Sequence, residues 1–224
     1  MKHLFLFLAL SILVVGCAQA PDADKAKVEN VSKSDEVAAK VAKSIPGLSL
    51  DTDKSLISWV GTKPTGSHTG TFKLTKGKMS VVKGELKGSF AIDMQSLEVT
   101  DLEGEGAAKL AGHLMSDDFF KVKEHPEARF ILTGTKPFNK ADFAGQELKM
   151  TDATHTATGL LTMLGVSKKI TFPAKVKIDG SKVSAEANFN IDRTSWGISY
   201  GNDSSLGDKF IKPEVNIGIV LASK

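Results

Sequence analysis

The stretch ITFPAKVKI, residues 170–178, alternates between apolar and polar side chains along its whole length. In a β-strand, successive side chains point to opposite faces of the sheet, so residues two apart share a face. One face therefore holds the apolar side chains, and the other holds Thr171, Pro173, Lys175 and Lys177. The pattern predicts a strand with one side in an apolar core and the other side in water.

The same alternation recurs along most of the chain. Further segments that show it are HTGTFKLT (68–75), GELKGSFAIDM (84–94), VSAEANFNI (183–191) and EVNIGIV (214–220). Asp179-Gly180 stands between two alternating segments and predicts a tight hairpin turn. We also expect a turn at Lys76-Gly77.

These segments together predict an all-β fold. A further hairpin is expected, with strands at 155–164 and 168–178 and a turn at Gly165. Strands that are apolar on one side must bring those sides together, and a closed antiparallel barrel or a flattened sandwich does so without helices. About eight strands are expected, and a barrel of that size has room for side chains or one small ligand. We therefore expect one antiparallel β-domain over residues 49–224, either a closed barrel or a flattened sandwich.

One segment, TDLEGEGAAKLAGHLMSDDFF (100–120), lacks the alternation. Its Leu110 and Leu114 lie one helical turn apart, which favours a short helix. We expect a helical insertion around residues 103–120, with Ser116 or Asp117 at its end.

The N-terminal residues predict an export signal. Lys2 precedes the apolar run LFLFLALSILVV, which has the length of the apolar part of a signal peptide and is short for a membrane span. The run ends in Val-Val-Gly-Cys, which resembles a bacterial lipobox. We therefore expect a lipoprotein signal peptide over residues 1–16 and acylation of Cys17; the alternative is an ordinary secretory peptide. Residues 17–48 are rich in Ala, Lys, Asp and Glu and predict a solvated tether.

Composition excludes several classes of function. The chain has 29 Lys and Arg against 26 Asp and Glu, a net charge of +3, and the lysines are dispersed along it. No basic block that would bind nucleic acid is present. Cys17 is the only cysteine among 224 residues, so the sequence offers no internal disulfide and no thiolate metal site.

The octet HLMSDDFF, residues 113–120, holds side chains that are candidates for reactivity. Ser116 lies near His113 in sequence, but the sharp turn that presents a hydrolase nucleophile is absent. The imidazole and the carboxylate of His113 and Asp117, four residues apart, do not complete a zinc site. We favour an architectural role for the octet, with catalysis and metal binding as alternatives.

Four sequence blocks resemble a known family. In chain order they are HLMSDDFF (113–120), KEHPEARF (123–130), GLLTMLGVSKKITFPA (159–174) and NIDRTSWGI (190–198). Together they resemble the YceI-like family of bacterial secreted proteins, over about residues 51–222. The resemblance implies a lipocalin-like, eight-stranded antiparallel barrel with a long apolar cavity that binds isoprenoid or other long-chain lipids. Where many members have a His-Ser pair and an Arg, this chain has Lys54-Ser55 and Met115, which suggests a ligand of its own.

The alternation places a set of apolar side chains inside the barrel, where they either line a cavity or pack on one another. Leu114, Phe119 and Phe120 are expected to form a plug or lid at one end, with the two phenylalanines paired with Phe130. The interior candidates are Phe72, Leu74, Phe90, Ile92, Met94, Leu161, Met163, Phe172, Val176, Phe189 and Ile217.

Three polar residues are candidate contacts for a lipid head group: His113, Lys168 and Arg193. The segment TMLGVSKKITFP lacks the spacing of a phosphate-binding P-loop, so Lys168 would act only from a hairpin at the rim of the cavity. Asp192 and Arg193 at a strand end favour a structural role, with the guanidinium on loop carbonyls, over a contact with a ligand phosphate.

The sequence as a whole predicts an envelope lipoprotein, without enzymatic activity, metal or cofactor, that binds or carries a long-chain isoprenoid-type or other amphiphilic lipid. Its expected partners are that lipid and, through Cys17, a membrane. We expect the bacterial outer membrane, facing the periplasm or the cell surface, and leave a homodimer open. The alternatives are a structural or interaction module of the envelope without a ligand, and an envelope hydrolase of lipid-like substrates.

Overall fold

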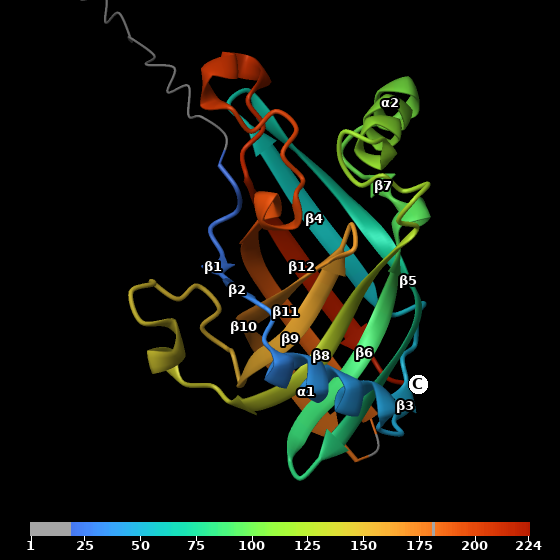
Figure 1. Cartoon of the computed structure of the whole chain (residues 1–224), viewed down its shortest axis with the longest axis vertical. Helices are drawn as coiled ribbons and strands as arrows, with labels where there is room; N and C mark the ends of the chain where they lie inside the picture. Colours follow the sequence, from blue (N-terminus) through green and yellow to red (C-terminus); the bar gives the residue numbers. More distant parts are fainter. Residues whose placement is uncertain (1–18, 181) are drawn as a thin grey trace, which may run out of the picture.

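The computed structural model describes residues 19–180 and 182–224, so the predicted signal peptide and Cys17 lie outside the described residues. Each wall strand pairs antiparallel with the next, and the last pairs with the first to close a barrel (Figure 1). The all-β barrel expected from the sequence is confirmed. In the part of the chain that the structure describes, the eight wall strands are β4 (Leu56–Lys63), β5 (Gly66–Val82), β6 (Glu85–Asp93), β8 (Glu127–Pro137), β9 (His155–Met163), β10 (Val166–Asp179), β11 (Lys182–Asp192) and β12 (Glu214–Ala222).

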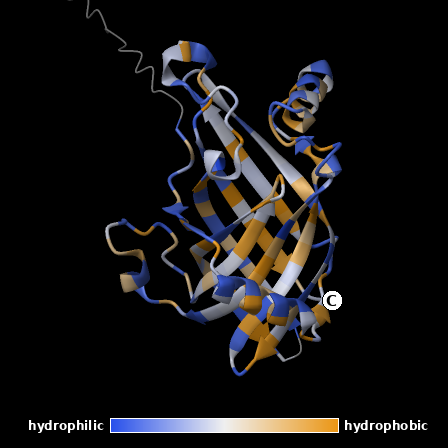
Figure 2. Ribbon diagram, viewed as in Figure 1, coloured by the Kyte–Doolittle hydropathy of each residue, from blue (hydrophilic) through white to orange (hydrophobic). Residues whose placement is uncertain are grey.

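The alternation of side chains explains how the wall packs. In β10, Ile170, Phe172 and Val176 are buried inside the barrel, whereas Lys175 and Lys177 are exposed. Figure 2 shows the same switching between hydrophobic and hydrophilic residues along the other strands. The inward faces of all eight strands together form one core.

Two predicted hairpins are confirmed. β10 and β11 pair up to Asp179 and Lys182, on either side of the predicted turn. β9 and β10 are joined by Leu164 and Gly165, whose φ angles of 51° and 74° are those of a tight hairpin turn.

The turn predicted at Lys76-Gly77 is wrong. β5 continues through these residues, with an irregularity in its pairing to β6 between Leu74 and Lys76. A Cβ atom at position 77 would collide with the side chains of Leu50 and Phe90. Gly77 is therefore required by close packing inside a long strand, and it does not mark a reversal of the chain.

The segment before the barrel differs from the predicted tether. β1 (Asp24–Lys25) pairs with β11, and β2 (Lys27–Asn30) pairs with β10. The helix α1 (Lys33–Ser44) then lies across β8, β6 and β9 (Figure 1). These residues are part of the folded domain.

Small side chains hold α1 against the wall. Ala39 and Ala42 are buried and pack with Ile131 and Leu160 of the barrel. The larger apolar side chain of Val41 in the same helix does not take part in this packing, because it is 48% exposed. The sequence signal for the start of this helix is a capping box, which Ser32 and Asp35 form with reciprocal hydrogen bonds.

The predicted helical insertion is present as α2 (Gly104–Met115), beside the upper end of the barrel (Figure 1). It ends at Ser116, whose backbone N–H and hydroxyl both donate to the carbonyl oxygen of His113. None of the helices in the described ranges is long and apolar enough to span a membrane. The remaining short elements are β3 (Leu48–Ser49), β7 (Glu98–Val99) and the 3-10 turns η1 (Met94–Ser96), η2 (Lys140–Phe143), η3 (Arg193–Trp196) and η4 (Ser204–Lys209).

Candidate functional site

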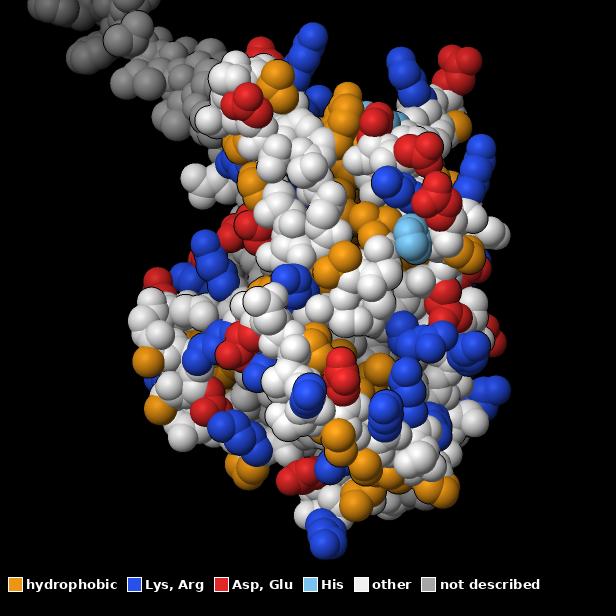
Figure 3. Space-filling view, viewed as in Figure 1, with side chains coloured by type: hydrophobic (Ala, Val, Ile, Leu, Met, Phe, Trp, Pro, Cys, Tyr) orange, Lys and Arg blue, Asp and Glu red, His pale blue; other side chains and the backbone are white. Residues whose placement is uncertain are grey.

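The barrel interior is hollow at one end and filled at the other. At the end beside α2, which we call the open end, a cavity has a volume of about 310 Å³. At the opposite end, which we call the closed end, the remaining void is only about 40 Å³. Figure 3 shows hydrophobic side chains at the surface of the upper half of the molecule, near α2. The open end is therefore the candidate binding site.

Aromatic rings fill the closed end. Phe172 stacks on Phe189 with ring centres 4.1 Å apart. Phe130 lies between Phe90 and Phe172, with centre-to-centre distances of 5.3 and 5.9 Å. These offset and tilted arrangements are the preferred ones for aromatic pairs, and they leave no room for a ligand.

The predicted interior residues divide between the two ends. Phe90, Phe172 and Val176 border the small void of the closed end, and Leu74 and Phe189 are buried in the packed core. The predicted interior residues that line the open-end cavity are Phe72, Ile92, Met94, Leu161, Met163 and Ile217.

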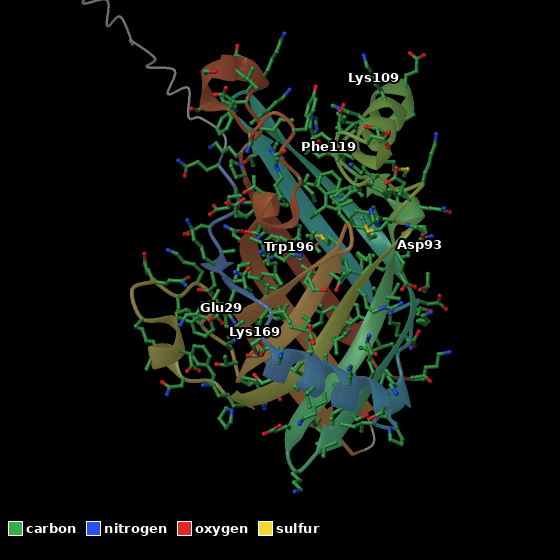
Figure 4. The ribbon with its side chains drawn as sticks, in the orientation of Figure 1. Glu29, Asp93, Lys109, Phe119, Lys169 and Trp196 are labelled. Atoms are coloured by element: carbon green, nitrogen blue, oxygen red, sulfur yellow. The ribbon has the colours of Figure 1, made fainter. Side chains whose placement is uncertain are left out.

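The predicted plug residues Leu114, Phe119 and Phe120 all line the cavity. Phe119 lies beside α2 at the upper end of the barrel (Figure 4). Phe120 meets Phe72 edge to face, with ring centres 5.8 Å apart. The expected pairing with Phe130 is wrong, because that ring is buried at the closed end beside Phe90 and Phe172.

His113 stands at the cavity wall among aromatic rings. Its ring contacts Phe119 and Tyr200 edge to face, at 5.2 and 4.9 Å between centres. Its Nε2 is 3.1 Å from a carboxylate oxygen of Asp118. The helix α2 ends at Met115, and the carboxylate beside His113 is that of Asp118 and not that of Asp117 four residues away.

Arg193 lines the cavity, but its guanidinium is committed to the backbone. It donates to the carbonyl oxygens of Ile198, Tyr200, Ile211 and Lys212, at 2.6 to 3.3 Å. Burial lowers the pKa of this guanidinium, and the nearby charge of the Asp192 carboxylate opposes that shift. The arrangement matches the structural role favoured by the sequence, because one side chain ties together the loops around the open end.

Lys168 does not line the cavity. Its Nζ donates to the side-chain oxygen of Asn30 in β2, at 2.8 Å. The sequence could not indicate this partner, since Asn30 belongs to the segment that was expected to be a solvated tether. The head-group role predicted for Lys168 has no support in this placement.

Four polar or aromatic residues of the cavity wall were not anticipated: Trp59, Thr62, Lys63 and His68. They lie on β4 and β5, which extend to the upper end of the barrel (Figure 1). His68 Nδ1 is 2.9 Å from a carboxylate oxygen of Asp101. The sequence offered only a weak signal for this set, because the segment 59–68 is mixed in polarity.

The octet has no catalytic arrangement around its serine. The hydroxyl of Ser116 donates to the backbone carbonyl of His113, at 2.7 Å, and not to the imidazole. Throughout the described part of the chain, no cluster of three or more His, Cys, Asp or Glu side chains could hold a metal ion. The octet ends a helix and supplies rings to a cavity wall.

The fold and the cavity define this protein as a lipocalin-type antiparallel barrel with an internal apolar pocket. The chain belongs to the YceI-like family, because the model of the YceI-like domain matches residues 48–222. The family expected from the four sequence blocks is confirmed.

Curated relatives match over part of their length. A UPF0312 protein of Pseudomonas putida strain F1 is 30% identical over 128 residues. The match covers 56% of this chain and 58% of the relative. A second Pseudomonas putida protein of the same designation, from strain GB-1, is 29% identical over the same length.

Two solved structures share the fold. BcnA of Burkholderia cenocepacia superposes with a TM-score of 0.59 and 21% identity, over 78% of this chain and 99% of that one. A polyisoprenoid binding domain from Saccharophagus degradans superposes with a TM-score of 0.56 and 20% identity, over 80% and 98% of the two chains. At these identities the likeness establishes the architecture only.

Proposed function

We propose that the protein binds a long-chain amphiphilic lipid of the isoprenoid type, with its apolar chain in the open-end cavity. The observation that carries this proposal is the apolar cavity of about 310 Å³ inside the open end of the barrel, above a closed end that is packed with aromatic rings. This volume is at the lower end of the range for small-molecule sites, roughly 300–1,000 Å³. The cavity therefore suits one segment of a long chain, with the remainder of the lipid at the rim.

Burial of the chain provides the driving force. Each buried methylene contributes about 0.8 kcal/mol. About ten methylenes would contribute roughly 8 kcal/mol, which is comparable to the association cost of about 4–15 kcal/mol. The name of the Saccharophagus degradans domain is consistent with this ligand class. Binding and carriage of this kind need no catalytic group.

The polar rim suits the head group. Lys63, His68 and His113 line the cavity together with its apolar residues. Two of them are histidines beside carboxylates, Asp101 and Asp118, at 2.9 and 3.1 Å. A polar or anionic head group would find donors there while its chain is buried below.

Extraction of native protein tests the proposal. Protein purified from its own cells is extracted with organic solvent, and the extract is analysed by mass spectrometry. A long-chain lipid in stoichiometric amount is the expected result. The control is Ala128→Trp, which places an indole in the cavity from a residue of its wall and should abolish the recovered lipid. A well-folded parent protein that yields no lipid would instead favour a structural or interaction module of the envelope.

We also propose that Cys17 is acylated and holds the protein on a membrane of the cell envelope. The support is the lipobox-like sequence Val-Val-Gly-Cys after the apolar run. Two acyl chains anchor stably where a single chain binds only marginally. Labelling with a fatty-acid analogue should mark the parent protein and not Cys17→Ser, which should move to the soluble fraction. Equal labelling of both proteins would contradict acylation at this residue.

A further inference from the structure

A second hollow lies on the outside of the barrel wall. It has a volume of about 430 Å³ and lies between the end of α1, the short strand β3 and the outer faces of β5, β6 and β8. Of the described residues that line it, none also lines the open-end cavity. Figure 3 shows Lys and Arg side chains gathered beside the end of α1. We call this hollow the basic groove, because four cationic side chains line it: Lys43, Lys76, Lys78 and Arg129.

The register of the strands explains why these cations meet. Lys76 of β5 lies opposite Ala91 of β6, and Ala91 lies opposite Arg129 of β8. Side chains of directly opposite residues share one face of a sheet, so two long cations flank one small side chain. In the next row, Lys78 lies opposite Ser89. The floor of the groove therefore consists of small side chains, and its sides carry positive charge.

The side of the groove next to α1 is held by the chain that follows the helix. The hydroxyl of Ser80 in β5 donates to the carbonyl oxygen of Pro46. Gly47 lies so close to β5 that a Cβ atom there would collide with the carbonyl oxygen of Met79. β3 then pairs antiparallel with β5. The groove is thus built from paired backbone, and a ligand would not have to order a loop in order to bind.

The positive charge of the groove is only partly neutralised. The carboxylate of Glu127 contacts the Arg129 guanidinium and lies 3.7 Å from Lys76 Nζ. In the part of the chain that the structure describes, the side chains of Lys43 and Lys78 have no ion-pair or hydrogen-bond partner. Four cations and one paired carboxylate leave an excess of three positive charges around the groove.

Two neighbouring features change this balance little. The C-terminal end of a helix carries partial negative charge on its carbonyl groups. At the end of α1, however, the carbonyl oxygen of Val41 already accepts hydrogen bonds from the Ile45 N–H and the Ser44 hydroxyl. The backbone of Lys224 bonds to Ser49 at the edge of the groove, and this last residue carries one charge of each sign.

We propose that the basic groove binds a small phosphate compound with at least two negative charges, of the diphosphate class. The planar guanidinium of Arg129 matches the oxygens of a phosphate, and the lysines act as point charges. The hydroxyls of Ser49 and Ser89 add further donors. Lys76 and Arg129 start two interstrand spacings apart, roughly 10 Å, so a ligand with two phosphates would meet both sides. The volume is within the range of small-molecule sites, roughly 300–1,000 Å³.

A membrane surface is a poorer occupant of the groove. β6, which supplies the floor, lies four strands from β11 in the eight-stranded wall, so the groove and β11 are on opposite sides of the barrel. The N-terminal segment joins the barrel at β11, where Asn190 donates to the Pro21 carbonyl oxygen. An anchor at Cys17, as proposed above, would leave the groove on the side away from the bilayer.

Calorimetric titration of the purified protein with pyrophosphate tests the proposal. We expect a dissociation constant below about 1 mM, and inorganic phosphate should bind about tenfold more weakly. Lys43→Gln/Lys78→Gln should weaken pyrophosphate binding by about tenfold or more, because it removes both unpaired cations. The matched control is Lys40→Gln/Lys73→Gln, which changes exposed lysines of α1 and β5 outside the groove and should alter the affinity by less than about twofold.

A third variant separates a shaped site from mere positive charge. Arg129→Lys keeps the charge but removes the planar fork, so it should weaken pyrophosphate binding by about threefold to tenfold. An unchanged affinity in this variant would mean that the guanidinium does not contact the ligand, and the site as proposed would be wrong.

Chemical labelling of the parent protein needs no variant. Acetylation of lysine amines is followed by mass spectrometry with and without pyrophosphate. The ligand should slow the acetylation of Lys43 and Lys78 and leave that of Lys40 and Lys73 unchanged. Equal protection of all four lysines would show a diffuse effect of charge and would contradict a site in the groove.

The remaining outcomes each overturn the proposal. Failure of pyrophosphate to bind at about 1 mM removes the site, and equal weakening by the two double variants replaces it with a long-range field. Citrate that binds as tightly as pyrophosphate excludes selection of phosphate. Phosphatidylglycerol vesicles that displace pyrophosphate from the Cys17→Ser protein would identify a lipid surface as the partner. Recovery of a lipid from the open-end cavity is independent of all these results.

Discussion

The two ends of the barrel differ although the same strands build both. Phe90 and Ile92 lie two residues apart on one face of β6, yet Phe90 borders the closed end and Ile92 lines the cavity. At the closed end, phenylalanines from neighbouring strands meet ring to ring. At the open end, Phe119 and Phe120 of the helical insertion line the cavity wall together with Phe72 of β5. Hydrophobic alternation thus specifies which face is inside, and the size and meeting points of side chains decide whether the inside is filled.

The largest effect is expected at the closed end. Phe172→Ala should lower the free energy of unfolding by about 3–5 kcal/mol, because it removes a ring that touches both Phe130 and Phe189. Urea unfolding measures this loss. Lipid uptake by the folded fraction should be unchanged, since the ring is absent from the open-end wall. A loss below about 1 kcal/mol would mean that the closed end is not a packed core.

The next effect concerns the loops around the open end. Arg193→Lys should lower the free energy of unfolding by about 2–4 kcal/mol, because an ammonium cannot serve the four carbonyls that the guanidinium reaches. Hydrogen exchange should accelerate in residues 198–212 first. Arg129→Lys is the matched control at an exposed position, with an expected change within about 0.5 kcal/mol. Uniform loosening of the whole barrel would contradict a local role at the rim.

One substitution made at both ends tests the comparison directly. Ala174→Leu adds bulk beside the void of about 40 Å³ and should destabilise the protein by about 1–3 kcal/mol through overpacking. Ala128→Leu adds the same bulk to the wall of the larger cavity and should cost less than about 1 kcal/mol while reducing lipid uptake. Thermal unfolding and a fluorescent lipid titration measure the two properties. Equal destabilisation at both positions would mean that the cavity is not available space.

The smallest effect is a pH dependence at the rim. Burial alone would raise the pKa of Asp101, but hydrogen bonds from the Thr69 N–H and from His68, together with the charge of His68, outweigh it and lower the pKa. A carboxylate with a lowered pKa stabilises the fold above its ordinary value of 3.8, and this contribution is lost as the pH falls through the lowered value.

The variant Asp101→Asn lacks this titration. Its melting temperature should therefore fall less than that of the parent protein between pH 5 and pH 2, measured at constant ionic strength. Identical pH profiles for the two proteins would show that the His68–Asp101 contact does not stabilise the open end.

The barrel could be predicted because its strands are buried on one face and solvent-exposed on the other. β10 has both properties that such a prediction needs, alternation and a strong hairpin turn at Asp179-Gly180. The N-terminal elements could not be predicted. β1 and β2 are too short to show a period, and α1 packs through alanines, which are as common in a flexible linker as in a packed helix. The turn predicted at Lys76-Gly77 is wrong because the sequence alone does not distinguish a glycine that permits close packing from a glycine that reverses the chain.

The candidate site was only partly predictable. The apolar lining follows from the strand period, and Phe119 and Phe120 line the open-end cavity, while their role as a plug or lid stays a prediction. Trp59 of the cavity wall could not be predicted, because the segment 59–68 is mixed in polarity and shows no clear alternation. Lys168 was wrongly placed in the site because its partner Asn30 lies 138 positions away in sequence.

The attachment of Pro21 to β11 limits the length of any tether to a membrane. Asn190 Nδ2 donates to the carbonyl oxygen of Pro21 at 3.0 Å, so the chain is already held to β11 at that residue. If Cys17 carries the lipid anchor that the sequence predicts, the four residues from Cys17 to Pro21 could reach about 14 Å, against about 110 Å for a tether that ran to residue 48. β11 continues from this attachment into Arg193 at the open end. With such an anchor, a tether this short would keep the β11 side of the barrel close to the bilayer, and a lipid would have only a short path through water between membrane and cavity.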